Sequence, residues 1–317
     1  MDYILLVIGL ALITYCADLL TKGCVGMAAR FCVPEFIIGL TVMAVGTSMP
    51  ELTVSFMSAL KGSSSMAIGN VTGSNIFNTL VILGICAMVH PIVISKENVR
   101  RDIPICIGVS LLLWIATADR LLGISDTDTI NRVEGIILFL LYVVTIIYSI
   151  RTGKKEAAAA EPENNEPQMG WVKIIGFIII GLAGLIWGGN MCLNSATSIA
   201  RAWGVSEAII AVTIIAAGTS LPELASSLSA IVSKKPSLAM GNILGSNVAN
   251  ILLILGASAS VKPLTMGDIT QLDLGMVVGS AIILLLSALL MGKRKITRLE
   301  GALFFLAYVA YVITILK

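Results

Sequence analysis

Charge is scarce in this chain: only 13% of its 317 residues are Asp, Glu, Lys or Arg, whereas 57% are hydrophobic. A typical soluble protein is about 25% charged. The composition therefore argues against a soluble globular protein and predicts an integral membrane protein. Long apolar windows carry this prediction, because about 20 consecutive apolar residues can cross a bilayer as a helix.

Histidine is almost absent as well, since His90 is the only one. No Ser/His dyad or HExxH motif occurs, and His90 lies outside the duplicated motifs, which argues against an enzyme working within the membrane. The six cysteines follow no metal-binding spacing, and we expect them to be small, reduced core residues. The sequence predicts neither an enzyme nor a prosthetic group.

The chain contains ten apolar windows, and we expect an all-α integral membrane protein with ten transmembrane helices. Lys and Arg lie mostly in the loops that follow odd-numbered windows, about 15 against about 6 on the other side. The positive-inside rule then predicts that both termini are extracellular, in a plasma membrane. The windows are roughly 3–21, 35–60, 64–89, 103–118, 134–150, 172–198, 207–232, 237–259, 273–291 and 301–316.

Two parts of the sequence are nearly copies of each other. Residues 46–51 read GTSMPE and residues 218–223 read GTSLPE; 69–75 read GNVTGSN and 241–247 read GNILGSN. All matching positions lie about 172 residues apart, and about 22 of 49 positions are identical between 39–87 and 211–259. So dense a match indicates an internal duplication.

A polar linker at 151–170 separates the two copies and is expected to be cytoplasmic. It divides the chain into an N-terminal repeat, 1–150, and a C-terminal repeat, 171–317, each with five predicted helices. An odd number of spans makes the second half enter the membrane from the opposite side. The sequence therefore predicts two inverted-topology repeats, an arrangement suited to alternating access.

Each GTSxPE motif is expected to break its helix, the second and the seventh. Pro50 and Pro222 lack an N–H and clash with the preceding turn, while the glycine adds backbone freedom. The break is expected to leave carbonyls such as those of Ala44 and Thr47 without intrahelical partners. The second copy offers the same groups from Ala216 and Thr219. Ser48 and Ser220 add hydroxyl oxygens.

Glu51 and Glu223 place one carboxylate each in a segment of membrane length, where a charge is costly and indicates a functional site. Carboxylate, carbonyl and hydroxyl oxygens are the ligands that hard cations prefer. Two glutamates match the charge of one Ca²⁺, Na⁺ uses the same ligand types, and Mg²⁺ fits less well because it sheds water reluctantly. Zn²⁺ or copper would require His or Cys, which both motifs lack.

The GNxxGSNxxxN element supplies neutral oxygens and small residues. Ser74 and Asn78 lie four residues apart on one helix face, and Ser246 and Asn250 repeat the pattern. The glycines form small-xxx-small faces that allow close helix packing. For the two asparagines, ion ligation and interhelical hydrogen bonding remain equally open.

With these motifs the chain resembles the sodium/calcium exchanger branch of the cation/calcium antiporter superfamily, in its compact prokaryotic form. The resemblance implies four ion sites between the second, third, seventh and eighth helices. It implies a calcium site formed by the carboxylates of Glu51 and Glu223 and the carbonyls of Thr47 and Thr219. Sliding of the first and sixth helices would alternate access. The implied sodium ligands add Ala44, Ser48, Ser74, Ala216, Ser220 and Ser246, with Asn78 and Asn250 lining the middle site.

The resemblance implies an antiporter of Na⁺ and Ca²⁺, electrogenic at three to one. Potassium-dependent relatives carry Asp where this chain has Asn250, which argues against potassium transport. A Ca²⁺/H⁺ exchanger is the alternative of the same class, because buried glutamates can take up protons. A calcium channel is the alternative of another class, although inverted repeats with broken helices favour a carrier. No nucleic-acid partner is expected. The lipid bilayer is an expected partner, and a monomer is the expected functional unit.

Overall fold

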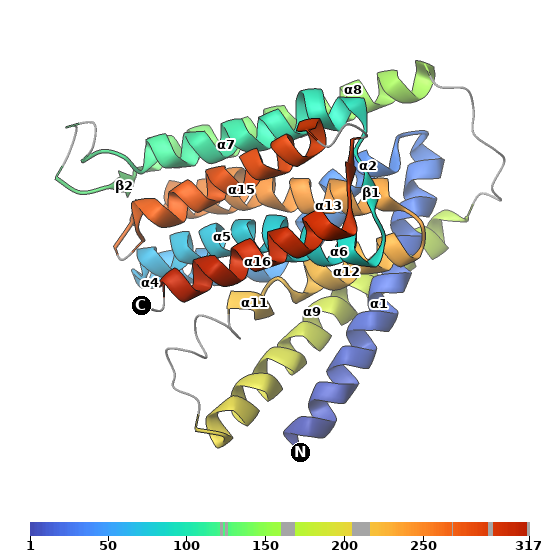
Figure 1. The fold of residues 1–317 in the computed structure, drawn as a ribbon, viewed down its shortest axis with the longest axis horizontal. Helices are drawn as coiled ribbons and strands as arrows, with labels where there is room; N and C mark the ends of the chain where they lie inside the picture. Colours follow the sequence, from blue (N-terminus) through green and yellow to red (C-terminus); the bar gives the residue numbers. More distant parts are fainter. Residues whose placement is uncertain are drawn as a thin grey trace. The chain divides into compact units, whose positions relative to one another are not determined.

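The computed structural model describes residues 1–120, 123, 126–159, 169–204, 216–267, 269–290 and 294–315. Within these ranges the protein is built almost entirely of helices, as the sequence predicts (Figure 1). The only strands described are four of two residues each, which pair as β1–β4 and β2–β3. The polypeptide therefore satisfies its backbone hydrogen bonds mainly within helices, as the interior of a bilayer requires.

Where the N-terminal half is described, it contains helices α1 to α8, three π-helical segments and strands β1 and β2. Their bounds are α1 Asp2–Phe31, α2 Glu35–Ile38, η1 Gly39–Met43, α3 Ala44–Thr47, α4 Met49–Lys61, α5 Ser64–Phe77, η2 Asn78–Ile82, α6 Leu83–Val89, β1 Ile92–Val93, η3 Asn98–Asp102, α7 Ile103–Ala116, β2 Thr129–Ile130 and α8 Arg132–Ala159.

The described residues of the C-terminal half contain helices α9 and α11 to α16, one π-helical segment and strands β3 and β4. Their bounds are α9 Trp171–Ala202, α11 Ala216–Gly218, α12 Leu221–Val232, α13 Pro236–Ala249, η5 Asn250–Leu255, α14 Gly256–Val261, β3 Leu264–Thr265, α15 Gln271–Leu290, β4 Lys295–Ile296 and α16 Arg298–Ile315.

Among the described residues, seven helices are long and apolar enough to cross a membrane, or eight if one bent pair counts as a single span. The ten predicted spans are not confirmed by this count. Helix α7 has only 14 residues and α12 only 12, which is shorter than the bilayer core requires of a straight helix. The predicted window at 207–232 begins with residues that lie outside the described ranges.

Two expected helix ends are wrong. Helix α1 continues to Phe31, so Lys22 and Arg30, expected in a loop, are helical. Helix α8 continues to Ala159 and therefore includes the first residues of the predicted linker, 151–159. Residues 160–168, the polar centre of that linker, lie outside the described part of the chain. Apolar windows underestimate the length of such helices because a charged residue ends the window but need not end the helix.

The chain folds into two compact units, and each unit combines segments from both sequence halves. The first unit comprises Met1–Met49, Ile146–Gly245 and Val312–Lys317; the second comprises Pro50–Thr145 and Ser246–Tyr311. Both copies of the duplication therefore contribute to each unit.

In the first unit, α1 and α9 pack tightly along glycine-rich faces and run side by side (Figure 1). A Cβ atom at Gly181 would lie 2.8 Å from the backbone nitrogen of Leu20, and one at Gly188 would lie 3.1 Å from the carbonyl oxygen of Gly9. Backbone atoms cannot move aside as a flexible side chain can. Glycine is therefore required at these contacts, as at other small-residue membrane interfaces.

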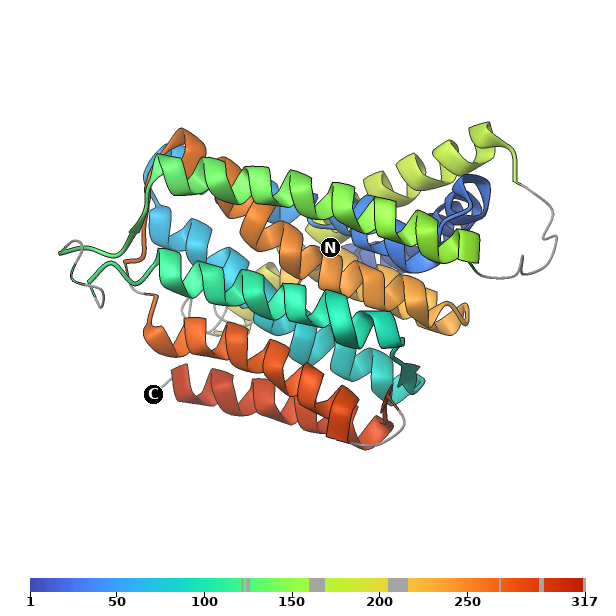
Figure 2. The same ribbon diagram turned by 90° about the horizontal axis from the view of Figure 1, so that it is seen from above.

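In the second unit, α7 packs against α15, and the two helices run together in both views (Figure 2). Short antiparallel pairs hold its loops: Ile92 pairs with Ile296, and Thr129 pairs with Thr265. These pairs join parts of the chain that are far apart in the sequence, so they fix loops at the ends of the helices.

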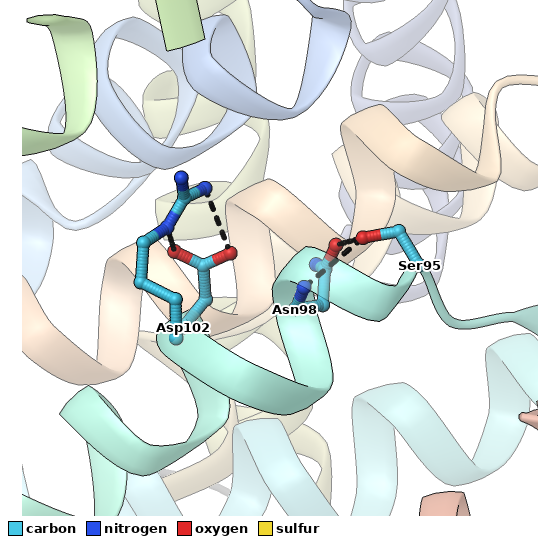
Figure 3. A network of polar contacts seen from close by, with 4 residues as sticks. Ser95, Asn98 and Asp102 are labelled. Atoms are coloured by element: carbon cyan, nitrogen blue, oxygen red, sulfur yellow. Dashed lines mark hydrogen bonds and ion pairs between the residues drawn. The ribbon is translucent and has the colours of Figure 1, made fainter. Parts of the chain in front are cut away.

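A polar cluster forms the entry to α7 in the second unit (Figure 3). The Ser95 hydroxyl donates to Oδ1 of Asn98 and accepts the backbone N–H of Asn98 at 3.0 Å. Asp102 is buried and forms an ion pair with Arg101, with Nε and Oδ1 2.9 Å apart. The cluster caps the first turn of η3 and lies outside both sequence copies, so its hydrogen bonds account for it as a structural element.

Candidate functional site

Each GTSxPE motif breaks its helix at the serine. Ser48 separates α3 from α4 with φ −81° and ψ 10°, and Ser220 precedes α12 with φ −89° and ψ 8°. Both conformations lie in the sparsely populated bridge region of backbone space. The segments Glu35–Thr47 and Met49–Lys61 form a bent pair with an angle of 49°. The predicted break in the second helix is confirmed, and the second copy repeats its backbone geometry.

The prediction that the break leaves the Ala44 carbonyl without an intrahelical partner is wrong. Its oxygen accepts the backbone N–H of Ser48 at 3.0 Å and the hydroxyl of Thr47 at 3.3 Å. The bridge conformation of Ser48 retains this hydrogen bond, so the break does not leave that oxygen without an intrahelical partner. Ala44 is fully buried.

The motif glycines serve helix packing. A Cβ atom at Gly46 would lie 2.5 Å from a methyl carbon of Leu182, and one at Gly218 would lie 2.4 Å from a methyl carbon of Leu193. Both leucines belong to α9. The missing side chains therefore let both broken segments approach α9, whereas the sequence suggested only backbone freedom.

The two motif glutamates are buried, each with 1% of its surface exposed. In the first unit, the Ser48 hydroxyl donates to Oε1 of Glu223 at 2.8 Å, so a residue of the first copy contacts the carboxylate of the second. Within the described chain, Oε2 of Glu223 is buried and has no hydrogen-bond partner. A buried carboxylate oxygen in this state is costly and is suited to a cation.

The other glutamate, Glu51, belongs to the second unit. The Ser74 hydroxyl donates to its Oε1 at 3.4 Å, and the Asn70 amide donates to its backbone oxygen at 3.3 Å. Ser74 is the serine of the first GSN sequence. Each carboxylate therefore has a hydroxyl group from one of the duplicated motifs beside it.

Asn70 and Asn242 form matching contacts in the two copies. Nδ2 of Asn70 donates to Oγ of Ser55 at 3.0 Å, and Nδ2 of Asn242 donates to Oγ of Ser227 at 2.9 Å. In the first unit, the Thr47 hydroxyl also donates to Oδ1 of Asn242 at 3.3 Å. These amides connect the helix that follows each break to the helix carrying the GNxxGSN element.

A network of amides joins the two copies within the second unit. Nδ2 of Asn78 donates to Oδ1 of Asn247 at 3.1 Å, and Nδ2 of Asn250 donates to Oδ1 of Asn75 at 3.0 Å. Across the described residues, Oδ1 of Asn78 and Oδ1 of Asn250 are buried without a hydrogen bond. The amide nitrogens hydrogen-bond across the two copies, and the amide oxygens stay available to a cation. Interhelical hydrogen bonding and ion ligation, the two roles that the sequence left open, can therefore be combined.

The same two asparagines mark a change of helix type. The π-helical segments η2 and η5 begin at Asn78 and Asn250, at equivalent positions of the copies. Such wider turns occur frequently at functional sites. Their duplication indicates that the local distortion belongs to the motif and is not an accident of one helix.

Of the predicted ligands, every described side chain is buried. For Ala216 only the backbone is described, as the first residue of α11. The first unit contains Ala44, Thr47, Ser48, Ala216, Thr219, Ser220 and Glu223; the second contains Glu51, Ser74, Asn78, Ser246 and Asn250.

Sequence reasoning gave no role to four asparagines and two serines whose hydrogen bonds organise these clusters. All six recur at the repeat spacing, which was the signal that could have identified them. They are Asn70, Asn75, Asn242, Asn247, Ser55 and Ser227.

Duplicated helix breaks that bury carboxylates among hydroxyl and amide oxygens define a polytopic membrane protein with an oxygen-rich interior. Residues 1–151 and 173–317 match the family model described as sodium/calcium exchanger protein. The chain therefore belongs to the sodium/calcium exchanger family, a family of membrane antiporters.

Relatives and solved structures agree with this assignment. The chain is 34% identical over 261 residues to the inner membrane protein YrbG of Escherichia coli (strain K12), covering 82% of this chain and 79% of that protein. It is 27% identical to the sodium/calcium exchanger MaX1 of Methanosarcina acetivorans, covering 99% and 98%. A structure of the sodium-calcium exchanger NCX_Mj, soaked with 10 mM Na⁺ and zero Ca²⁺, aligns with a TM-score of 0.83 at 29% identity, covering 98% of each chain.

Proposed function

We propose that this protein is a secondary antiporter that exchanges Na⁺ for Ca²⁺ across the plasma membrane by alternating access. The observation that carries the proposal is the pair of equivalent, buried glutamates, Glu51 and Glu223, each with a motif hydroxyl beside its carboxylate. Family membership and the names of two matched proteins, both sodium/calcium exchangers, support the same ions.

The chemistry of the donor set supports hard cations as the transported substrates. Carboxylate, hydroxyl, carbonyl and amide oxygens suit Ca²⁺, which takes about 6–8 of them, and they suit Na⁺ as well. Two carboxylates compensate the charge of one Ca²⁺. Sodium ions in the same groups would oppose calcium binding, so occupancy by the two ions would be mutually exclusive.

We assign the calcium ligands to the carboxylates of Glu51 and Glu223 and the backbone oxygens of Thr47 and Thr219. The burial of both threonines supports the assignment. Asn78 and Asn250 would contribute their amide oxygens to the middle site. The sodium ligands would add Ala44, Ser48, Ser74, Ala216, Ser220 and Ser246.

For alternating access we propose that α1 and α9 slide as one body. Their glycine-lined contact supports joint motion, because backbone-to-backbone packing resists separation. The proposed topology has ten spans in two inverted repeats, 1–150 and 171–317, joined by a cytoplasmic linker at 151–170. Both termini would then be extracellular, since the excess of Lys and Arg lies in the loops on the linker's side.

The proposed exchange is electrogenic, three Na⁺ for one Ca²⁺, with a monomer as the transporting unit. Potassium would not be required, because Asn250 is neutral and the site charge comes from two glutamates. A proton-coupled exchanger and a calcium channel remain the competing functions to be tested.

Uptake of ⁴⁵Ca²⁺ into proteoliposomes under separate Na⁺, K⁺ and H⁺ gradients tests this function. The proposal predicts saturable uptake that requires internal Na⁺ and does not need K⁺. Uptake driven by the pH gradient alone would instead identify a Ca²⁺/H⁺ exchanger. Uptake that does not saturate and needs no counter-ion would identify a channel. Protein-free liposomes provide the leak control.

A further inference from the structure

The buried amides of Asn75 and Asn247 occupy equivalent positions in the two copies, and the function proposed above gives them no role. Each is 3% exposed or less. Each accepts a hydrogen bond from an asparagine of the other copy, Asn250 or Asn78. An amide has a nitrogen that donates and an oxygen that accepts, so its orientation decides which end a neighbour receives.

The orientation of Asn75 is fixed by a group that can only accept. Its Nδ2 donates to the backbone oxygen of Asn247 at 3.2 Å. Turning this amide over would place two oxygens against each other. Oδ1 of Asn75 must therefore face Asn250, whose Nδ2 donates to it at 3.0 Å. The remaining end of Asn250 is its Oδ1, which is buried and has no hydrogen bond within the described residues.

A second set of bonds repeats this logic for Asn78. Nδ2 of Asn247 donates to Oγ1 of Thr79 at 2.8 Å, and its Oδ1 accepts Nδ2 of Asn78 at 3.1 Å. Oδ1 of Asn78 is then buried without a hydrogen bond in the part of the chain that is described. A hydroxyl can either donate or accept, so Thr79 fixes Asn247 less strictly than a carbonyl fixes Asn75.

We propose that Asn75 and Asn247 are positioning residues that hold the amide nitrogens of Asn250 and Asn78 and thereby present their oxygens to the transported cation. The proposal rests on the proposed function, since it requires an ion at these two oxygens. An amide oxygen attracts a cation and the NH₂ group repels it. A reversed amide would therefore replace a ligand with a repelling group, although side-chain volume would be unchanged.

A crossed set of double mutants in proteoliposomes tests the proposal. Asn75→Ala should raise the apparent KM for Ca²⁺ about 5-fold, the typical net effect of one hydrogen bond. The same change should not raise KM further in an Asn250→Ala background, because the amide that Asn75 holds is absent there. It should keep its full effect in an Asn78→Ala background. Asn247→Ala should show the reverse dependence. It should leave KM unchanged in an Asn78→Ala background and raise KM fully in an Asn250→Ala background.

Residues in direct contact couple in stability whatever their function. A merely structural role would therefore show its coupling in the thermal unfolding midpoint and would change KM by the same factor in every background. That result, or an unchanged KM in Asn75→Ala, overturns the positioning role while leaving wild-type exchange intact. If Asn75→Ala does not fold, Thr79→Val tests the other arm: it should raise KM when Asn78 is present and be silent in Asn78→Ala. A wild-type protein without Na⁺/Ca²⁺ exchange and without ⁴⁵Ca²⁺ binding in detergent overturns both proposals.

Discussion

Neutralising Glu223 by Glu223→Gln is the sharpest perturbation that the structure offers. The side chain is 1% exposed, and the Ser48 hydroxyl donates to its Oε1 at 2.8 Å. Glutamine retains the shape and one carbonyl-type oxygen that can still accept from Ser48. The substitution therefore removes one negative charge while changing little else.

The expected loss follows from Coulomb's law. Two unit charges 4 Å apart interact by about 4 kcal/mol at an effective dielectric constant of about 20. Ca²⁺ carries two charges, so its Coulomb energy with one carboxylate is about 8 kcal/mol. A loss of that size weakens Ca²⁺ binding by about 10⁵- to 10⁶-fold. The loss should be smaller for Na⁺, because its single charge halves the Coulomb energy. Sodium-driven calcium uptake is therefore expected to fall below detection.

The assay is ⁴⁵Ca²⁺ uptake by sodium-loaded proteoliposomes, with the amount of folded protein measured by size-exclusion chromatography. Glu300→Gln is the matched control: Glu300 is also buried and accepts the Thr297 hydroxyl at 2.7 Å, but it lies outside both copies. The control should keep the wild-type KM. Calcium uptake by Glu223→Gln at the wild-type KM would refute the reasoning.

Two further changes test single contacts. Ser48→Ala removes the hydrogen bond to the Glu223 carboxylate and should raise the apparent KM for Ca²⁺ about 10-fold or more, since bonds to charged groups contribute about 1.5–3 kcal/mol; an unchanged KM in the uptake assay would count against this contact. Gly181→Ala places a Cβ atom 2.8 Å from a backbone nitrogen of α1 and should lower the thermal unfolding midpoint, since overpacking costs about 1–3 kcal/mol. Gly176→Ala is its control on the same helix, because among the described residues nothing lies within 4 Å of the added atom, and equal midpoints for the two variants would contradict the packing argument.

Local chemistry made much of the fold predictable. Pro50 and Pro222 cannot continue a helix without a break, so the interruption at GTSxPE follows from the sequence alone. The duplicated motifs identified the same positions twice, and the structure shows Ser48 and Ser220 with nearly equal backbone angles. Apolar windows located helices, but they missed the end of α1, because Lys22 ends the window whereas the helix continues to Phe31.

Other features depend on contacts between residues far apart in the sequence. Gly46 is explained by Leu182 of α9, which no local pattern indicates. The amide orientation of Asn250 depends on Asn75, which in turn depends on a backbone oxygen of Asn247. Residue types and spacing identified Asn78 and Asn250 as candidates. Only the packing of the two copies decides which end of each amide forms a hydrogen bond. The Ala44 carbonyl was mispredicted because helix breaks can retain individual hydrogen bonds.

The central claim is that one Ca²⁺ is held by the carboxylates of both Glu51 and Glu223 and is displaced by Na⁺. A crystal structure of the protein soaked with Ca²⁺, followed by soaking with Na⁺, measures this directly. We predict one calcium ion with oxygens of both glutamates at about 2.3–2.6 Å, lost when Na⁺ is added. A calcium ion bound to only one of the two carboxylates, or retained at high Na⁺, would contradict the account.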